Sequence, residues 1–151
     1  MSLHDDVRIL SGVRLFQGFS PEQLRLLAFG SEKLRVTRHH EICREGAAAD
    51  AAYVVAAGQA GLYRERGGER AWVGTAGPGM LLGEVALIAP THWLTSAAAM
   101  SDVTLMRLDR MHFRRILEEY PELAVLLHKR ISSELQTMIR RIEELSPRFA
   151  G

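Results

Sequence analysis

The sequence contains a single cysteine, Cys43, among its 151 residues. One cysteine cannot form a disulfide within the chain, and this usage is typical of a reducing compartment, so we expect a cytoplasmic location. Long hydrophobic runs are also missing, because the most apolar stretches, Ala71–Leu82 and Val85–Met100, are interrupted by small, polar or proline residues. Neither stretch reaches the roughly 20 apolar residues that a membrane-spanning helix requires, so we expect no membrane contact.

An excess of charge of one sign is missing as well. The chain has 19 Lys and Arg residues against 18 Asp and Glu residues, a formal net charge of +1. This balance provides no bulk attraction to nucleic acid. The sequence ends at Gly151 without space for a recognition helix after the last helical segment, so we expect no direct contact of this chain with nucleic acid. A longer native protein with a DNA-binding domain is the alternative.

Catalytic motifs are absent too. The sequence has no Gly-x-Ser-x-Gly, Walker-type or His-Glu-x-x-His pattern, and we expect neither an enzyme nor a cofactor. His39, His40 and Cys43 lack the four-ligand spacing of a structural zinc site, so we also expect no metal.

The patterning changes twice along the chain. Residues 1–30 have helical spacing, with a helix start at Ser20 where the order Ser-Pro-Glu-Gln suits an N-cap and a capping box. Residues 34–108 contain about seven short runs rich in Val, Ile, Tyr, Trp and Thr between glycines, and Glu65–Glu69 is a hairpin signal. Residues 111–145 return to helical spacing, with a break at Tyr120 and Pro121.

These patterns predict one domain over residues 1–151 of α+β class. We expect an antiparallel β jelly roll, or double-stranded β-helix, flanked by N-terminal helices and a long C-terminal helix.

The last helix carries apolar residues at alternating steps of four and three, the period of a coiled coil. We predict a parallel homodimer through this helix; the alternative is that the stripe packs on the chain's own β core. The seam begins at Ala124, and the predicted interface residues are His128, Ile131, Leu135, Met138, Ile142 and Leu145.

Two segments carry a family resemblance. The first runs from Ile42 to Tyr63, with Gly46, Asp50 and Gly58 between short strands, and the second runs from Gly77 to Ile88 through Gly83 and Glu84. Their order and spacing, together with the helix start at Ser20 and the Tyr120–Leu123 break, resemble the cyclic-nucleotide-binding domain family, to which the sensor domain of the catabolite activator protein belongs. The resemblance covers about 130 residues.

The resemblance implies a regulatory sensor that binds cyclic AMP or cyclic GMP. It places the cyclic phosphate against the segment that begins at Gly83, with Glu84 accepting a hydrogen bond from the ribose 2′-hydroxyl. The ligand-binding residues that it implies are Gly83, Glu84, Val85, Ala86, Leu87, His92, Trp93, Leu94 and Thr95.

The chain departs from the family pattern at one position. Family members usually carry an arginine shortly after this segment, and an ungapped alignment places Trp93 there, with no arginine between Arg70 and Arg107. Three alternatives follow: weak binding of a cyclic nucleotide, binding of a flatter or less anionic ligand, or a degenerate pocket in a ligand-free dimerisation module. The sequence leaves all three open, and also the alternative that this is the sensor part of a longer transcription regulator.

Overall fold

The computed structural model describes residues 3–145, except for the side chains of Met138, Ile142 and Leu145. The helical elements are α1 (Leu3–Ser11), the 3₁₀ turn η1 (Arg14–Phe16), α2 (Pro21–Phe29), the 3₁₀ turn η2 (Glu84–Leu87), α3 (Arg110–Glu119) and α4 (Pro121–Leu145). The strands are β1 (Glu32–Val36), β2 (Glu41–Cys43), β3 (Ala48–Ala49), β4 (Ala51–Ala57), β5 (Ala60–Arg66), β6 (Glu69–Ala76), β7 (Leu81–Leu82), β8 (Thr91–His92), β9 (Ser96–Ala99) and β10 (Val103–Asp109).

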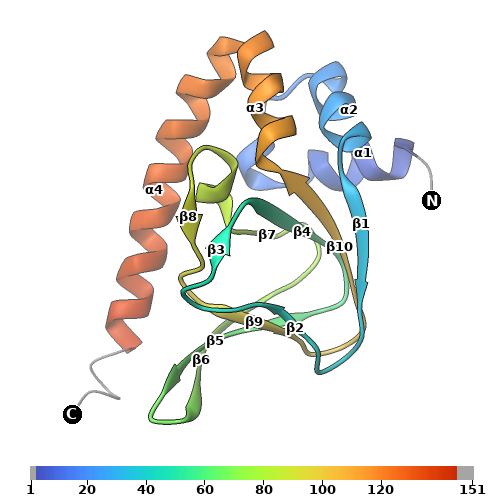
Figure 1. Cartoon of the computed structure of the whole chain (residues 1–151). Helices are drawn as coiled ribbons and strands as arrows, with labels where there is room; N and C mark the ends of the chain where they lie inside the picture. Colours follow the sequence, from blue (N-terminus) through green and yellow to red (C-terminus); the bar gives the residue numbers. More distant parts are fainter. Residues whose placement is uncertain (1–2, 146–151) are drawn as a thin grey trace.

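The strands form two antiparallel four-stranded sheets, in the orders β1-β10-β4-β7 and β2-β9-β5-β6, and the short pair β3-β8. The predicted jelly roll between terminal helices is therefore confirmed. Helices α1, α2 and α3 gather at one end of the roll, and α4 runs along its side past β8 (Figure 1). The hairpin of β5 and β6 extends at the opposite end (Figure 1).

Local sequence explains where the helices begin. The Gln23 amide donates to Ser20 Oγ over 3.1 Å while the Ser20 amide donates to Gln23 Oε1 over 2.8 Å, so the predicted capping box is confirmed. Asp109 caps α3 in a similar way, with its carboxylate accepting from the amides of Met111 and His112. At Tyr120 the backbone leaves the helical conformation, and Pro121 starts α4.

The first half of α4 packs on the core of its own chain. The side chains of Leu123, Leu127 and Ile131 are 5%, 0% and 2% exposed, and they lie in one cluster with the buried residues of α1, α2 and α3. The prediction of Ile131 as a dimer-seam residue is thus wrong for this structure, because intrachain contacts already bury its side chain. His128 is exposed, as a seam position requires, and remains a prediction.

The rest of the predicted seam lies farther along α4. Leu135 is half-buried against its own β roll. The side chains of Met138, Ile142 and Leu145 lie outside the described residues. The dimer through this part of α4 therefore stays a prediction.

Candidate functional site

A cavity of about 160 Å³ lies between η2, the segment around β8, and α4. Apolar side chains form most of its wall. The lining residues are Cys43, Ala49, Leu62, Leu82, Gly83, Glu84, Val85, Thr91, His92, Trp93, Leu94, Thr95, Ala97, Leu135 and Ile139. We call this space the η2 cavity.

The structure brings most of the predicted ligand-binding residues to this cavity. Gly83, Glu84, Val85, His92, Trp93, Leu94 and Thr95 all line it. Ala86 and Leu87 do not: they are 0% and 1% exposed and lie in the core, where Leu87 belongs to the cluster under the helices. Their side chains therefore do not face the cavity, because a tight 3₁₀ turn directs successive side chains to different faces, and a ligand contact through their backbone amides stays a prediction.

Trp93 fills the position that the resemblance assigns to an arginine. Its indole ring stacks on Tyr53 of β4, with 5.7 Å between ring centroids and an interplanar angle of 11°. Backbone hydrogen bonds fix the residue on both sides, since its amide donates to the Ala47 carbonyl and its carbonyl accepts from the Gly46 amide, each over 2.9 Å. The indole is therefore held in place by the ring contact and by its own backbone.

Gly83 makes room for this indole. Its φ of +78° lies in the left-handed region, and a Cβ built there would stand only 2.5 Å from Trp93 Cζ3. Any other residue would therefore meet both backbone strain and a steric clash. The tryptophan and the glycine are matched to each other.

Glu84 begins η2 and is the one acidic residue on the cavity wall. It is 7% exposed, and this burial raises the pKa of its carboxyl, with a further rise from the charge of Glu134 on α4. A hydrogen bond from its own backbone amide acts in the opposite direction. None of the described residues that line the η2 cavity is a lysine or an arginine, so no side chain of these two types on the wall compensates the carboxylate.

Replacing Glu84 with glutamine is expected to stabilise the fold at neutral pH. The folded-state pKa of Glu84 is raised above its unfolded value, so ionisation destabilises the folded state as pH rises through and above the unfolded pKa. We expect Glu84→Gln to raise Tm at pH 7.5 by about 2–4 °C, corresponding to roughly 1 kcal/mol. Near pH 4, where the carboxyl is largely protonated in both states, the difference should vanish. A lower Tm for the variant at pH 7.5 would contradict the assigned cause.

The long helix α4 contributes directly to the cavity wall through Leu135 and Ile139. Ile139 is 39% exposed. For Leu135, the heptad pattern predicts a position in the dimer seam. Sequence reasoning missed Ile139 as a cavity residue. The spacing of four between the two residues is a signal for one helix face, but it does not say what that face contacts.

A larger open groove, with a volume of about 1020 Å³, lies beside the η2 cavity and is lined by residues of α4, β6, β7 and η1. Leu62, Leu82, Glu84 and Thr95 line both spaces. The groove also carries four cationic side chains: Arg14, Lys129, Arg130 and Arg141. Basic groups therefore lie close to the cavity but on the groove's side of the shared wall.

Arg130 fastens α4 to the N-terminal region from within this groove. Its Nη1 atom donates to the carbonyl oxygens of Leu15 over 3.0 Å and Gln17 over 2.6 Å. These hydrogen bonds and the buried residues in the first half of α4 hold the start of this helix against η1 and the core.

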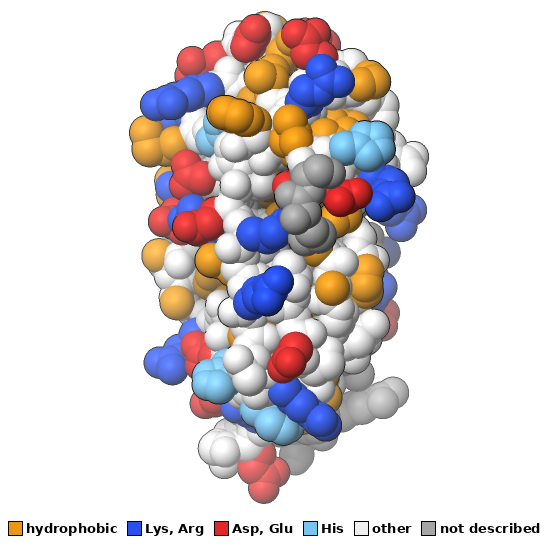
Figure 2. All heavy atoms as spheres, turned by 90° about the vertical axis from the view of Figure 1, so that its right-hand side faces the viewer, with side chains coloured by type: hydrophobic (Ala, Val, Ile, Leu, Met, Phe, Trp, Pro, Cys, Tyr) orange, Lys and Arg blue, Asp and Glu red, His pale blue; other side chains and the backbone are white. Residues whose placement is uncertain are grey.

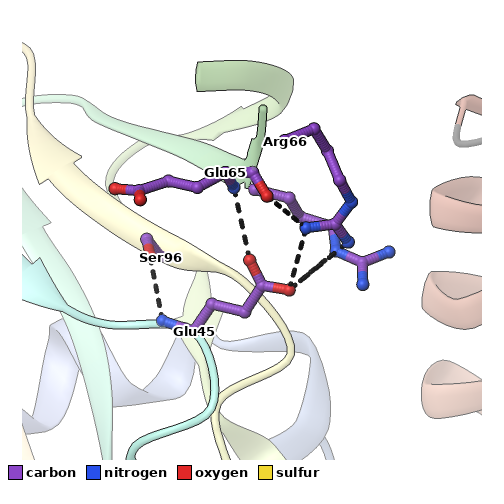
Figure 3. A network of polar contacts seen from close by, with 5 residues as sticks. Glu45, Glu65, Arg66 and Ser96 are labelled. Carbon is purple, nitrogen blue, oxygen red and sulfur yellow. Dashed lines mark hydrogen bonds and ion pairs between the residues drawn. The ribbon is translucent and has the colours of Figure 1, made fainter. Parts of the chain in front are cut away.

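Glu45 lies in the turn after β2 and forms several hydrogen bonds there (Figure 3). Its Oε2 accepts from Arg64 Nε over 3.0 Å and from Arg66, and its Oε1 accepts from the Glu65 amide over 3.4 Å. Burial opposes ionisation of this carboxyl, but the hydrogen bonds from the two arginines outweigh burial and lower its pKa. Its own amide donates to Ser96 Oγ over 2.9 Å. These bonds tie the turn after β2 to β5 and β9, which supply cavity residues.

Cys43 and the neighbouring histidines do not form a second site. Burial raises the pKa of the Cys43 thiol to about 12, so it stays protonated at neutral pH and is a poor nucleophile. Across residues 3–145, no cluster of His, Cys, Asp and Glu side chains has the arrangement of a metal site. The thiol acts as a small apolar group in the cavity wall.

Residues 33–120 match the family model described as cyclic nucleotide-binding domain. The chain belongs to this family. A solved structure of a cyclic nucleotide-binding-like protein from Brucella abortus is 49% identical in sequence with a TM-score of 0.70, and the match covers 76% of this chain and 98% of that one. The cyclic AMP receptor protein of Thermus thermophilus is 29% identical over 147 residues, covering 93% of this chain and 68% of that protein.

A relative from another class of protein matches a shorter stretch. The regulatory subunit of cAMP-dependent protein kinase from Eremothecium gossypii is 34% identical over 103 residues, which cover 68% of this chain and 22% of the subunit. The chain thus spans about two thirds of the length of the Thermus thermophilus protein and about a fifth of the length of the kinase subunit. Among the helices of residues 3–145, none combines the length and apolar character needed to cross a membrane.

Proposed function

We propose that this cyclic nucleotide-binding domain is a regulatory sensor, which binds a small ligand in the η2 cavity and signals its presence through α4. One observation carries the proposal: Leu135 and Ile139 of α4 line the same cavity as Glu84 and Trp93. A ligand there touches the signalling helix directly. We propose a cytoplasmic location for this sensor and no catalytic activity.

The two halves of α4 differ in a way that suits signalling. The first half is fixed by Leu123, Leu127 and Ile131 in the core and by the hydrogen bonds of Arg130. The second half meets the roll at the cavity through Leu135 and Ile139. A ligand that binds one position of the second half better than another shifts the population of α4 conformations while its start stays anchored.

Cyclic AMP and cyclic GMP are the first ligands to consider, since two relatives are named for cyclic AMP. Trp93 replaces the arginine that pairs with the phosphate, and a hydrogen bond to a charged group is worth roughly 1.5–3 kcal/mol. We therefore expect affinity about 10- to 150-fold below that of an arginine-containing site.

The rival function is a ligand-free dimerisation module. The stack of Trp93 on Tyr53 favours it, because the indole occupies space that a phosphate would need. A homodimer through α4 is compatible with both functions. Light scattering of wild type and of the His128→Glu variant, which is changed at an exposed position of α4, tests the dimer. A wild-type mass equal to one chain at micromolar concentration would contradict the homodimer.

A matched pair of tryptophan variants tests the coupling between the cavity and α4. Trp93→Ala removes a cavity wall, and we expect hydrogen exchange of residues 132–139 to accelerate by about tenfold, equal to 1.4 kcal/mol of local stability. Trp72→Ala is the control, because Trp72 is 46% exposed on β6 and is not among the residues that line the cavity. Unchanged exchange of α4 in Trp93→Ala would contradict the proposal.

A further inference from the structure

The described part of the η2 cavity wall contains no lysine or arginine, and its one basic side chain is the imidazole of His92, although cationic side chains are close by. Its 15 residues include no lysine or arginine, while the adjoining groove carries Arg14, Lys129, Arg130 and Arg141. Arg130 is already committed to the Leu15 and Gln17 carbonyls. An anion in the η2 cavity would lose water without gaining a lysine or arginine partner from the described wall, which is strongly unfavourable.

The one carboxyl group among the described residues of this wall has the wrong sign for an anion when it is ionised. Glu84 is 7% exposed, lines the cavity and lies close enough to Glu134 for the two carboxylates to repel. An ionised carboxylate accepts hydrogen bonds through two oxygens and donates none. A ligand that brings a hydroxyl or amino donor would therefore be favoured over one that brings a phosphate or carboxylate.

Trp93 covers the backbone where an anion would approach. The Cζ3 and Cη2 atoms of its ring lie 2.5 and 2.6 Å from the position of a Cβ on Gly83, so the indole rests directly against the glycine. The indole of Trp93 also stacks on the ring of Tyr53. The start of η2 is thus shielded by an apolar ring.

The size of the space limits the ligand further. The cavity volume of about 160 Å³ is close to that of a 150 Å³ apolar cavity known to bind benzene. Leu62, Leu82, Leu135 and Ile139 supply the apolar contacts. A single ring with a short polar substituent matches both the volume and the wall.

We propose that the η2 cavity of this chain takes a small uncharged ring compound with one hydrogen-bond donor directed to Glu84, in preference to an anionic nucleotide. This inference rests on the proposed sensor function and specifies its ligand class. It assigns to Trp93 the role of a specificity-determining residue that excludes anions.

Calorimetric titration with two matched probes tests the proposal. Benzyl alcohol and benzoate share one ring and differ in charge at the substituent. At pH 7.5 we expect benzyl alcohol to bind with an affinity at least about tenfold higher than benzoate and cyclic AMP, a difference of about 1.4 kcal/mol or more. Equal or tighter binding of benzoate or cyclic AMP would overturn the proposal, as would the absence of benzyl alcohol binding at millimolar concentration.

Two variants on α4 locate the binding. Leu135→Phe narrows the cavity and should abolish benzyl alcohol binding, whereas Val125→Phe, at a position 75% exposed on the same helix, should leave it unchanged. If Leu135→Phe does not fold, Ile139→Phe replaces it. Retained binding in the narrowed cavity would place the probe elsewhere and overturn the proposal.

Hydrogen exchange of α4 in the same samples separates the two proposals. If cyclic AMP binds tightly and changes the exchange of residues 132–139, the sensor function stands and the ligand class is wrong. If benzyl alcohol binds in the cavity and the exchange is unchanged, the ligand class stands and the signalling role of α4 is wrong.

Discussion

Replacing Trp93 with arginine is expected to raise the affinity for cyclic AMP by about 10- to 150-fold. The change removes the indole that lies against Gly83 and supplies a planar cation that pairs with phosphate oxygens through two hydrogen bonds. The gain corresponds to the roughly 1.5–3 kcal/mol of a charged hydrogen bond. Calorimetric titration of wild type and variant with cyclic AMP measures it.

Trp93→Leu is the control for this prediction, because it removes the indole without adding charge. A similar gain in Trp93→Leu would show that the tryptophan acts only by its bulk. No gain in folded Trp93→Arg would mean that the start of η2 does not bind phosphate in this chain, and the departure from the family pattern would then extend beyond one residue.

Replacing Gly83 with alanine is expected to have the largest effect on stability. The left-handed φ of +78° costs a residue with a Cβ roughly 1–2 kcal/mol, and the contact of that Cβ with Trp93 adds roughly 1–3 kcal/mol of overpacking. A total of about 2–5 kcal/mol should lower Tm by roughly 4–20 °C, since each kcal/mol shifts Tm by 2–4 °C at this chain length. Thermal unfolding followed by circular dichroism measures the change.

Two comparisons separate strain from clash. Gly18→Ala has a similar φ of +89° with open space around the added Cβ, so it should show only the strain. Gly83→Ala in the Trp93→Ala background should likewise lose the clash and recover roughly 1–3 kcal/mol. If Gly83→Ala and Gly18→Ala destabilise equally, the match between Gly83 and the indole has no energetic consequence.

Local signals predicted much of the fold. The capping box at Ser20, the hairpin between β5 and β6, and the break before Pro121 each depend on a few adjacent residues. The turn at Gly67 and Gly68 confirms the hairpin signal, because both residues have the positive φ that tight hairpins need. Such features are set by backbone chemistry within one turn and can be predicted from sequence.

Other features depend on packing that the sequence does not show. The pair β3–β8 has only two residues in each strand, Ala48–Ala49 with Thr91–His92, and so leaves no periodic pattern. The heptad on α4 predicted a partner helix, yet Ile131 packs on its own core and Leu135 on the η2 cavity. An apolar stripe specifies which face is covered but not by which surface.

Charges of both signs share the surface. On the face shown in Figure 2, acidic and basic side chains are interspersed over the visible surface, without a continuous basic area. Four cationic side chains, Arg14, Lys129, Arg130 and Arg141, also line the groove beside α4, together with Glu84 and Glu134.

The most direct test of the account is a methyl-detected NMR titration with benzyl alcohol and cyclic AMP in separate samples. Ile139 on α4 lines the η2 cavity, and Ile116, 4% exposed in the core under the helices, is the internal reference. We predict that benzyl alcohol shifts the δ1 methyl resonance of Ile139, assigned with Ile139→Val, and leaves the resonance of Ile116 in place. An Ile139 resonance unmoved by either compound at millimolar concentration would contradict the claim that α4 senses the contents of this cavity.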